Sequence, residues 1–260
     1  MRLALWQGEG APGNLAATLS EVERVAGLAA ARGTGLLVFP EGYLTGYHLP
    51  RLSPGDLTGV EAALGQVGRI GARAGLGIVI GSHTGDGDTI RNSAVAFDAA
   101  GTEMGRYHKR ALFGPWEKGT FRPGQQTCLF DCAGLKVGLA ICYDVEFPEL
   151  IRPYARLGAD LVVVPTALMA PHDRIARQVA PVRAMENQVF LAYCNRTGHE
   201  AGLDYVGLSC ICGPRGQVLA AAAGDPELLI ADLDPAILAE ERGENSYLSD
   251  LNLLDRPHAS

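Results

Sequence analysis

The stretch KVGLAICYDVEFPELIRPYARLGADLVVV, residues 136–164, decides the fold class. It opens with a short apolar run over 136–141 and closes with another over 160–164, and such runs are typical of buried strands. The segment from Phe147 to Leu157 predicts a helix between them, with Pro148 suited to its first turn. A helix between two buried strands favours an α/β fold.

The same alternation continues toward the N-terminus. A strand over Arg2–Gln7 precedes a helix from about Asn14 to Ala31, whose apolar residues recur every three or four positions. Asn14 can cap the start of this helix and Gly33 its end. A second helix runs to about Ala74, and its first residues, 58–61, form a capping-box pattern. The other strands expected in this half cover 36–39, 77–81, 92–98 and 105–109.

The chain also alternates toward the C-terminus. A helix is expected from about Asp173 to Gln188, with a kink or a restart at Pro181. The strands expected after it cover 190–194, 207–211, 217–220 and 228–232. From Pro235 onward the pattern predicts a helix and then an extended tail. No repeat or low-complexity segment interrupts this order, so we expect one domain over residues 1–260 with a tail from about 235.

Helices that cover one side of a sheet leave its other side in need of a partner. A four-layer αββα sandwich of two sheets would satisfy this need, and a doubly wound three-layer sheet would fit the periodicity equally well. The residues alone leave both arrangements open.

Composition limits the classes of partner. The chain has 260 residues, of which 47% are hydrophobic, and a formal net charge of −7. An acidic chain argues against nucleic-acid and anionic-membrane partners, which both select a basic patch. No stretch approaches the ~18 apolar residues of a membrane span, and the first residues have too short an apolar run for a signal peptide. We therefore expect a cytoplasmic protein.

Cysteine and histidine spacing gives no sign of a metal site. Six cysteines in this length are too sparse for a disulfide scaffold. Cys210 and Cys212 alternate on one expected strand, but they lack the further Cys and His ligands of a zinc site. The six histidines show no metal-binding spacing either, so we expect no metal.

Four polar residues stand at expected strand ends or in the loops beyond them, where open α/β sheets place their ligands: Glu41, Lys109, Glu117 and Cys142. Amide hydrolysis needs a nucleophile, a base, an acid for the leaving amine, and donors for the oxyanion. A cysteine between a strand and a helix, close to a lysine, is expected to have its thiolate stabilised. Each residue taken alone has an ordinary structural explanation, and a buried strand-end cysteine usually serves packing.

Three segments resemble the signature blocks of the nitrilase superfamily of carbon–nitrogen hydrolases. They are Phe39-Pro40-Glu41, Tyr107-His108-Lys109, and Ile141-Cys142-Tyr143-Asp144 with Phe147-Pro148-Glu149. Weaker matches, such as Arg183-Ala184-Met185-Glu186-Asn187, extend the resemblance to near the C-terminus. It implies the αββα sandwich, an enzyme that hydrolyses linear amides, a homodimer or larger assembly, and no cofactor.

The resemblance also implies a role for each polar residue. Glu41 matches the general base, Lys109 the lysine that stabilises the oxyanion, and Cys142 the nucleophile that forms a thioester. Glu117 matches a second glutamate that orients the lysine. The backbone N–H of Tyr143 would be the second oxyanion donor.

Cys-Tyr-Asp at 142–144, where nitrile-cleaving relatives commonly have Cys-Trp-Glu, favours an amidase. Several blocks are similar to aliphatic amidases that act on 5-aminopentanamide, so we expect a small aliphatic amide, with an ω-amino amide as one candidate. N-carbamoyl compounds and nitriles are alternatives within the superfamily, and a non-catalytic binding protein is an alternative of another class.

The substrate pocket is expected to be mostly aromatic. The residues expected to bind the substrate are Tyr47, Phe113, Trp116, Tyr143, Phe147 and Thr166. For a cationic far end of the substrate, Glu146, Asp173 and Asp204 are candidates, and nothing in the sequence selects one. The stretch Tyr247–Pro257 is expected to cross a subunit interface, on resemblance alone.

Overall fold

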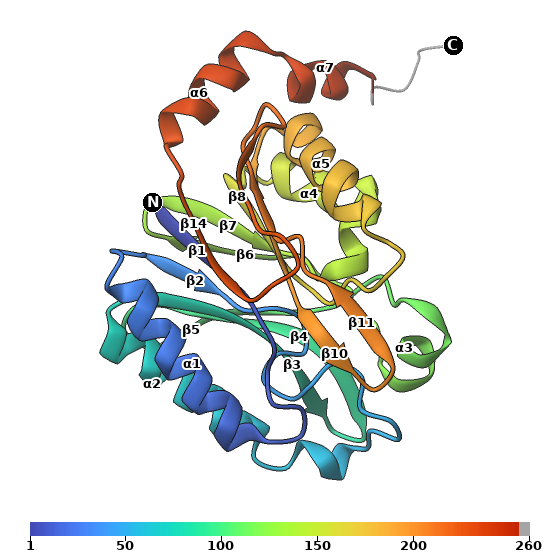
Figure 1. Cartoon of the computed structure of the whole chain (residues 1–260). Helices are drawn as coiled ribbons and strands as arrows, with labels where there is room; N and C mark the ends of the chain where they lie inside the picture. The colour runs from blue at the N-terminus through green and yellow to red at the C-terminus, as the bar shows by residue number, and fades with distance from the viewer. Residues whose placement is uncertain (255–260) are drawn as a thin grey trace.

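A computed structural model of the chain describes residues 1–254. Two six-stranded sheets lie face to face, and each carries helices on its outer side (Figure 1). The layers therefore run helix, sheet, sheet, helix, and the structure has the αββα sandwich rather than the three-layer alternative.

The first sheet has the strand order β14-β1-β2-β3-β4-β5. The parallel strands β1 (Arg2–Gln7), β2 (Leu36–Val38) and β3 (Gly77–Asp86) form its centre. The antiparallel strands are β4 (Thr89–Phe97), β5 (Glu103–His108) and β14 (Glu227–Asp232). Helices α1 (Leu15–Ala30) and α2 (Val60–Ala74) cover its outer face.

The second sheet has the order β13-β12-β9-β8-β7-β6. The parallel strands β7 (Leu135–Leu139), β8 (Leu161–Thr166) and β9 (Phe190–Asn195) form its centre. The antiparallel strands are β6 (Cys128–Cys132), β12 (Cys210–Cys212) and β13 (Val218–Ala221). Helices α4 (Pro148–Arg156) and α5 (Ala180–Asn187) cover its outer face.

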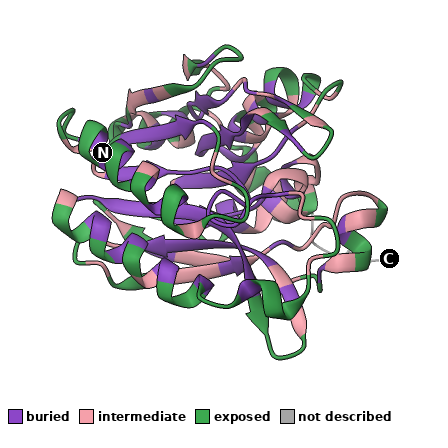
Figure 2. Ribbon diagram, turned by 60° about the horizontal axis from the view of Figure 1, so that its bottom comes forward, coloured by how far each residue is buried: buried purple, intermediate pink, exposed green. Residues whose placement is uncertain are grey.

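Strand alternation divides the buried side chains among the layers. On β1, Ala4 and Trp6 pack toward the helices, whereas Leu3 and Leu5 pack toward the other sheet. Both sheets are therefore buried on both faces, while the helices keep an exposed outer side (Figure 2). Two sheets that share one apolar core hold the ends of their strands in fixed positions, and the site lies at these ends.

Several local expectations were wrong. The capping box at 58–61 does not form, because Gly59 is the N-cap of α2 and the Thr58 hydroxyl donates to the carbonyl of Gly55 (2.8 Å). The strand expected over 207–211 is the shorter and later strand β12, Cys210–Cys212. Glu117, expected in a loop beyond a strand, belongs to a short helix, α3 (Gly114–Thr120).

Other elements were not anticipated at all. Strand β6 is one, and the hairpin of β10 (Thr197–Glu200) and β11 (Leu203–Val206) is another. By contrast, the helix expected over 173–188 is present, and its expected restart near Pro181 is confirmed. A π-helical segment, Ile175–Val179, is followed by α5, whose first turn contains Pro181.

The helix expected from Pro235 is confirmed as α6 (Pro235–Glu244), whereas a second helix, α7 (Tyr247–Leu254), lies where an extended tail was expected. The part of the expected interface stretch beyond residue 254 lies outside the described residues.

Candidate active site

The ends of β2 and β5 bring two of the four polar residues together. Glu41 follows β2 at a point where the chain passes close to β3, and a Cβ atom at Gly81 would lie 2.3 Å from the carbonyl oxygen of Pro40. Lys109 directly follows β5, and its N–H donates to the carbonyl of Asn92 on the neighbouring strand (2.8 Å). Both side chains are fully buried.

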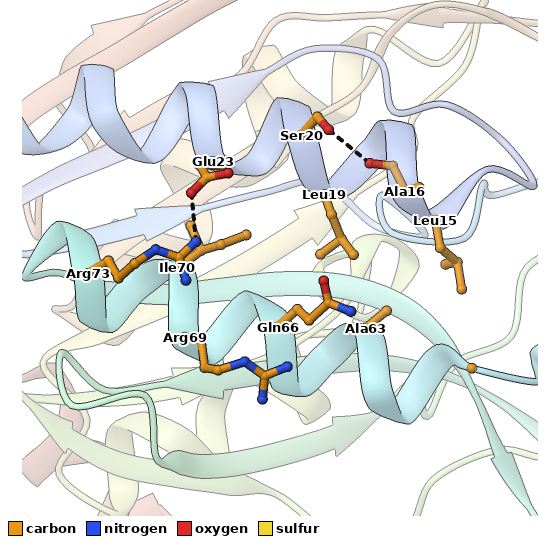
Figure 3. Close-up of a pocket in the computed structure, with 11 residues that line it drawn as sticks. Leu15, Ala16, Leu19, Ser20, Glu23, Ala63, Gln66, Arg69, Ile70 and Arg73 are labelled. Carbon is orange, nitrogen blue, oxygen red and sulfur yellow. Dashed lines mark hydrogen bonds and ion pairs between the residues drawn. The ribbon is translucent and has the colours of Figure 1, made fainter.

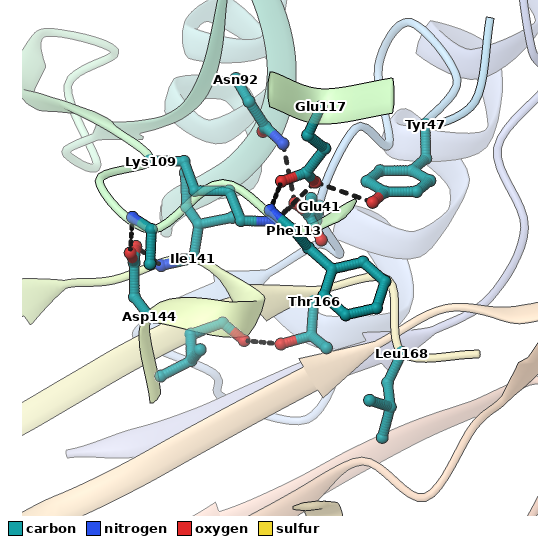
Figure 4. Close-up of polar contacts among 12 residues, drawn as sticks. Glu41, Tyr47, Asn92, Lys109, Phe113, Glu117, Ile141, Asp144, Thr166 and Leu168 are labelled. Carbon is teal, nitrogen blue, oxygen red and sulfur yellow. Dashed lines mark hydrogen bonds and ion pairs between the residues drawn. The ribbon is translucent and has the colours of Figure 1, made fainter. Parts of the chain in front are cut away.

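The Lys109 ammonium bridges two carboxylates. It donates to Glu41 Oε1 (2.8 Å) and to Glu117 Oε1 (2.7 Å), as Figure 4 shows. The Asn92 amide also donates to Glu41 Oε1 (2.7 Å), whereas Glu41 Oε2 is buried and has no hydrogen-bond partner within residues 1–254. Glu41 is therefore fixed through one oxygen and keeps the other free to exchange a proton.

Helix α3 places Glu117. Its Oε1 accepts from the Tyr47 hydroxyl (2.7 Å) as well as from Lys109, and its Oε2 accepts from the backbone N–H of Phe113 (2.5 Å). Because both oxygens are occupied, Glu117 is suited to hold the lysine rather than to transfer protons.

Cys142 begins a 3₁₀ turn, Cys142–Glu146, directly beyond β7. Its φ of +44° is in the left-handed region, which costs a residue with a side chain free energy unless its surroundings hold it there. Cys142 as a residue is partly exposed, and it lines a small cavity of about 170 Å³. The cavity is lined by Tyr47, Phe113, Cys142, Tyr143, Glu146, Ala167, Leu168, Met169, His172 and Arg174.

Electrostatics set the resting protonation of the site. Burial, and then the negative charge of Glu41, raise the pKa of the Cys142 thiol well above its usual value, while Lys109 and a backbone hydrogen bond from Ala167 lower it. The expectation of a stabilised resting thiolate is therefore wrong, since burial outweighs the lysine.

The two charged partners have shifted pKa values as well. Burial raises the pKa of Glu41 above its ordinary value, against the opposing charge of Lys109. Burial alone would lower the pKa of Lys109, but Glu41 and Glu117 outweigh it and keep that pKa raised. A neutral thiol beside a carboxylate that binds protons readily is an arrangement for proton transfer during attack.

The predicted pocket residues separate into two groups. Tyr47, Phe113 and Tyr143 line the cavity, whereas Trp116, Phe147 and Thr166 do not. Trp116 packs against Tyr47 (ring centroids 5.6 Å apart) and Phe147 against Tyr143 (4.9 Å). Thr166 is buried, and its carbonyl accepts from the N–H of Glu41 (3.3 Å). Trp116 and Phe147 therefore contact residues that line the cavity, and Thr166 contacts Glu41.

Two further residues were missed by the sequence reasoning. Asp144 is fully buried, and its carboxylate accepts hydrogen bonds from both the cysteine and the lysine segments. Arg196 is also buried, and its guanidinium donates to the carbonyls of Glu41 (3.4 Å) and Gly42 (3.3 Å) and to Glu200 (2.6 Å) on the β10–β11 hairpin. Asp144 stood in a quoted motif, but nothing in the sequence marked Arg196.

The larger surface grooves of the described residues are not lined by Glu41, Lys109, Glu117 or Cys142. A groove of about 480 Å³ lies between α1 and α2 on the outer layer (Figure 3). Its polar side chains include a Glu23–Arg73 ion pair (2.6 Å) and Ser20, which donates to the carbonyl of Ala16 (3.1 Å). The described residues contain no cluster of three or more His, Cys, Asp or Glu side chains able to hold a metal ion. Among the described helices, none is long and apolar enough to cross a bilayer.

Comparison with known proteins places this geometry in a family. The sequence pattern of a protein family described as "Carbon-nitrogen hydrolase" matches residues 2–242. The chain belongs to the carbon–nitrogen hydrolase family. It is an enzyme of the nitrilase superfamily, and the fold expected from the three blocks is confirmed.

Individual proteins resemble this chain over nearly its whole length. A hydrolase from the pqqF 5' region of Pseudomonas protegens is 38% identical, over 96% of this chain and 88% of its own. A nitrilase from Pyrococcus abyssi is 34% identical, over 90% and 87%. The structure of an amidase from Nesterenkonia sp. is 35% identical with a TM-score of 0.85, over 94% of each chain, and a mutant of that amidase has been solved in complex with butyramide.

Proposed function

We propose that this carbon–nitrogen hydrolase converts a short aliphatic amide to its carboxylate and ammonia through a thioester on Cys142. The observation that carries the proposal is the buried Lys109 ammonium held between two carboxylates beside the cavity of Cys142. Such a lysine is a fixed donor for an oxyanion that forms where water is excluded. A non-catalytic binding protein has no need of this costly buried charge cluster.

In the first half of the reaction, Cys142 Sγ attacks the amide carbonyl carbon while the thiol proton passes to Glu41 Oε2. The carbonyl oxygen becomes an oxyanion that accepts from Lys109 Nζ and from the backbone N–H of Tyr143. The C–N bond then breaks, and Glu41 returns the proton to the departing nitrogen, which leaves as ammonia.

In the second half, water attacks the thioester carbon. Glu41 takes a proton from this water, and the same two donors hold the new oxyanion. The C–S bond breaks, the carboxylic acid forms, and the proton on Glu41 returns to the sulfur. Each residue regains its starting state, and water is the only other reactant.

The cavity supports a small substrate. Its volume of about 170 Å³ is below the range of pockets for drug-sized ligands, and Tyr47, Phe113 and Tyr143 give it aromatic walls. The butyramide complex of the similar amidase supports the same size of acyl group. N-carbamoyl compounds and nitriles are the alternatives within the superfamily.

An ammonia-release panel tests the reaction. Short aliphatic amides should release ammonia, and the wild-type enzyme should accumulate a covalent adduct of acyl mass on Cys142 when mixed with substrate. Cys142→Ala should abolish turnover without changing the melting temperature. Cys128→Ala, the control, should keep its turnover. A wild-type enzyme that hydrolyses nitriles but no amides would refute the amide as the substrate class. Unchanged turnover in Cys142→Ala would refute Cys142 as the nucleophile.

For the far end of the substrate we propose a terminal amine, as in 5-aminopentanamide. Of the three acidic candidates, only Glu146 lines the cavity, and its carboxylate has no hydrogen bond or ion pair with the described residues. Asp173 pairs with Arg177 (3.4 Å) and Asp204 with His199 (2.7 Å), and both are exposed. Arg174 on the same rim is exposed, so water screens its repulsion of an ammonium.

The ratio of kcat/KM for 5-aminopentanamide to that for pentanamide isolates this contact. Glu146→Gln should lower the ratio about tenfold, as expected for a partly buried charge pair. Asp173→Asn and Asp204→Asn are matched controls that should leave the ratio unchanged. A wild-type preference for pentanamide, or for a carboxylate-ended amide, would rule out the terminal amine.

We also propose a homodimer or larger assembly in the cytoplasm. The outer side of α5 and the neighbouring α7 expose Val182, Met185, Tyr247 and Leu254, an apolar surface that a second copy would cover. The six free cysteines, one of them the proposed nucleophile, fit a reducing compartment. Sedimentation of the wild type beside Met185→Glu tests the assembly, and a monomeric wild type would refute it.

A further inference from the structure

One buried carboxylate holds both halves of the proposed site. Asp144 Oδ2 accepts from the backbone N–H of Ile141 (3.0 Å) and from the Tyr107 hydroxyl (2.8 Å). Its Oδ1 accepts from the backbone N–H groups of Ala111 (2.7 Å) and Arg110 (3.3 Å). Figure 4 shows Asp144 beside Ile141, on the opposite side of Lys109 from Glu117.

The first set of contacts closes the turn that contains the nucleophile. The Ile141 N–H donates to the Asp144 carboxylate, and the Asp144 N–H donates back to the carbonyl of Ile141 (3.0 Å). Cys142 lies inside this reciprocal pair with its φ of +44°. A left-handed conformation at a residue with a side chain persists only where neighbouring contacts enforce it.

A second set of contacts, from Tyr107 and Ala111, binds the Asp144 carboxylate to the chain on both sides of Lys109. Tyr107 precedes Lys109 by two residues, and Ala111 follows it by two. Both donate to the same carboxylate, so the Lys109 segment cannot shift relative to the Asp144 side chain without breaking a buried hydrogen bond.

We propose that Asp144 is a positioning residue that fixes the distance and angle between the Cys142 thiol and the Lys109 ammonium. The carboxylate is the required group, because four donors converge on it and only an acceptor without protons of its own satisfies all four. The inference deepens the proposed function of this site and rests on it for the effect on turnover.

The decisive comparison is between Asp144→Asn and Asp144→Glu. The amide of Asn has nearly the same shape as the carboxylate, but its NH₂ group would face two of the four donors and leave them without an acceptor. Glu keeps two accepting oxygens but adds a methylene group to a fully buried position. A role in packing alone therefore favours Asn, and a role as a fourfold acceptor favours Glu.

For ammonia release from butyramide, Asp144→Asn should lower kcat about 100-fold with a change in KM below about threefold, as expected when an interaction needed only in the transition state is misaligned. Asp144→Glu should retain a higher kcat than Asp144→Asn. Tyr107→Phe, which removes one donor and leaves the carboxylate, should lower kcat by less than Asp144→Asn does. Equal kcat in Asp144→Asn and wild type, or a higher kcat in Asp144→Asn than in Asp144→Glu, would overturn the proposal.

A measurement that needs no hydrolysis of an amide substrate separates this inference from the proposed function. Alkylation of Cys142 by iodoacetamide, followed by mass spectrometry across pH, reports the thiol directly. Its midpoint should move to higher pH in Asp144→Asn, because the Lys109 charge that favours the thiolate would lie in a different place. An unchanged midpoint would overturn the positioning role, whereas a wild type that is alkylated normally but hydrolyses no amide would overturn only the proposed function.

Discussion

Arg196, which precedes β10, and Glu200, the last residue of β10, form a buried ion pair with Nη2 and Oε2 2.6 Å apart. The pair joins the hairpin to the segment that follows β2. Arg196 donates to the carbonyls of Glu41 and Gly42, Glu200 Oε1 accepts from the N–H of His48 (2.8 Å), and the guanidinium lies over the Tyr205 ring (5.1 Å). The hairpin is thereby fastened to the loop that carries the proposed base.

Breaking this pair from one side should be costly. Glu200→Gln leaves the Arg196 charge buried without its partner, and the free energy of unfolding should fall by about 3 kcal/mol. Urea denaturation measures this free energy of unfolding. The control is Asp173→Asn, which breaks the exposed pair with Arg177 and should lower the free energy of unfolding by less than about 1 kcal/mol. Similar losses in the two variants would mean that the buried pair contributes no more than a surface pair.

The bridging lysine makes a kinetic prediction. Lys109→Gln removes the charged donor from the oxyanion, so kcat should fall by about 10²–10³. Lys118→Gln, on the exposed side of helix α3, should leave kcat unchanged. A loss of less than about tenfold in Lys109→Gln would assign the lysine to holding the two carboxylates and not to the oxyanion.

The raised pKa of Glu41 predicts where activity is lost in acid. Glu41 must be ionised to take the thiol proton, so kcat/KM should fall as the pH drops through its pKa. Because burial raises that pKa above the ordinary 4.5, the acid limb should lie above pH 4.5. A pH profile of kcat/KM for butyramide measures the limb, and a limb at or below 4.5 would show that Lys109 outweighs burial.

Much of this fold could be predicted, because its central elements carry local signals. The helical period of α1 and the apolar runs of β2 and β8 reflect burial on one face or on both, and burial leaves a repeat in the residue pattern. The hairpin of β10 and β11 carries no such repeat. It is held by contacts of Arg196 with Glu41 and of Tyr205 with Tyr47, and these pairs are too far apart in the sequence for a local pattern to show them.

The site, like the fold, has features that the sequence predicts and features that depend on the folded structure. Family blocks pointed to Glu41, Lys109 and Cys142, whereas spacing alone gave each of them an ordinary alternative. The pKa of Cys142 could not be predicted, because it depends on how deeply the thiol is buried and on which charges face it. Asp144 was visible in the cysteine block, but its role depends on donors from Tyr107 and Ala111, which only the folded chain brings to it.

A buried histidine beside the site should make the fold sensitive to acid. His83 is fully buried against Trp116 and Phe121, and neither ring nitrogen has a hydrogen-bond partner in the described part of the chain. Burial, and then the charges of Arg196 and Lys109, lower its pKa to about 3. The unfolded chain holds the same group near its usual pKa of about 6.5.

Between these two values the unfolded state binds more protons than the folded state, so stability is complete above about pH 6.5 and falls as the pH drops toward 3. His83 alone should lower the free energy of unfolding by about 2 kcal/mol between pH 7 and pH 5, at ~1.4 kcal/mol per unit below 6.5. Urea denaturation at the two pH values should show a smaller difference in His83→Leu than in wild type, while His199→Gln on the exposed hairpin keeps the wild-type difference. If His83→Leu loses as much stability as the wild type over this interval, the imidazole titrates equally in both states and the acid sensitivity arises from the carboxylates instead.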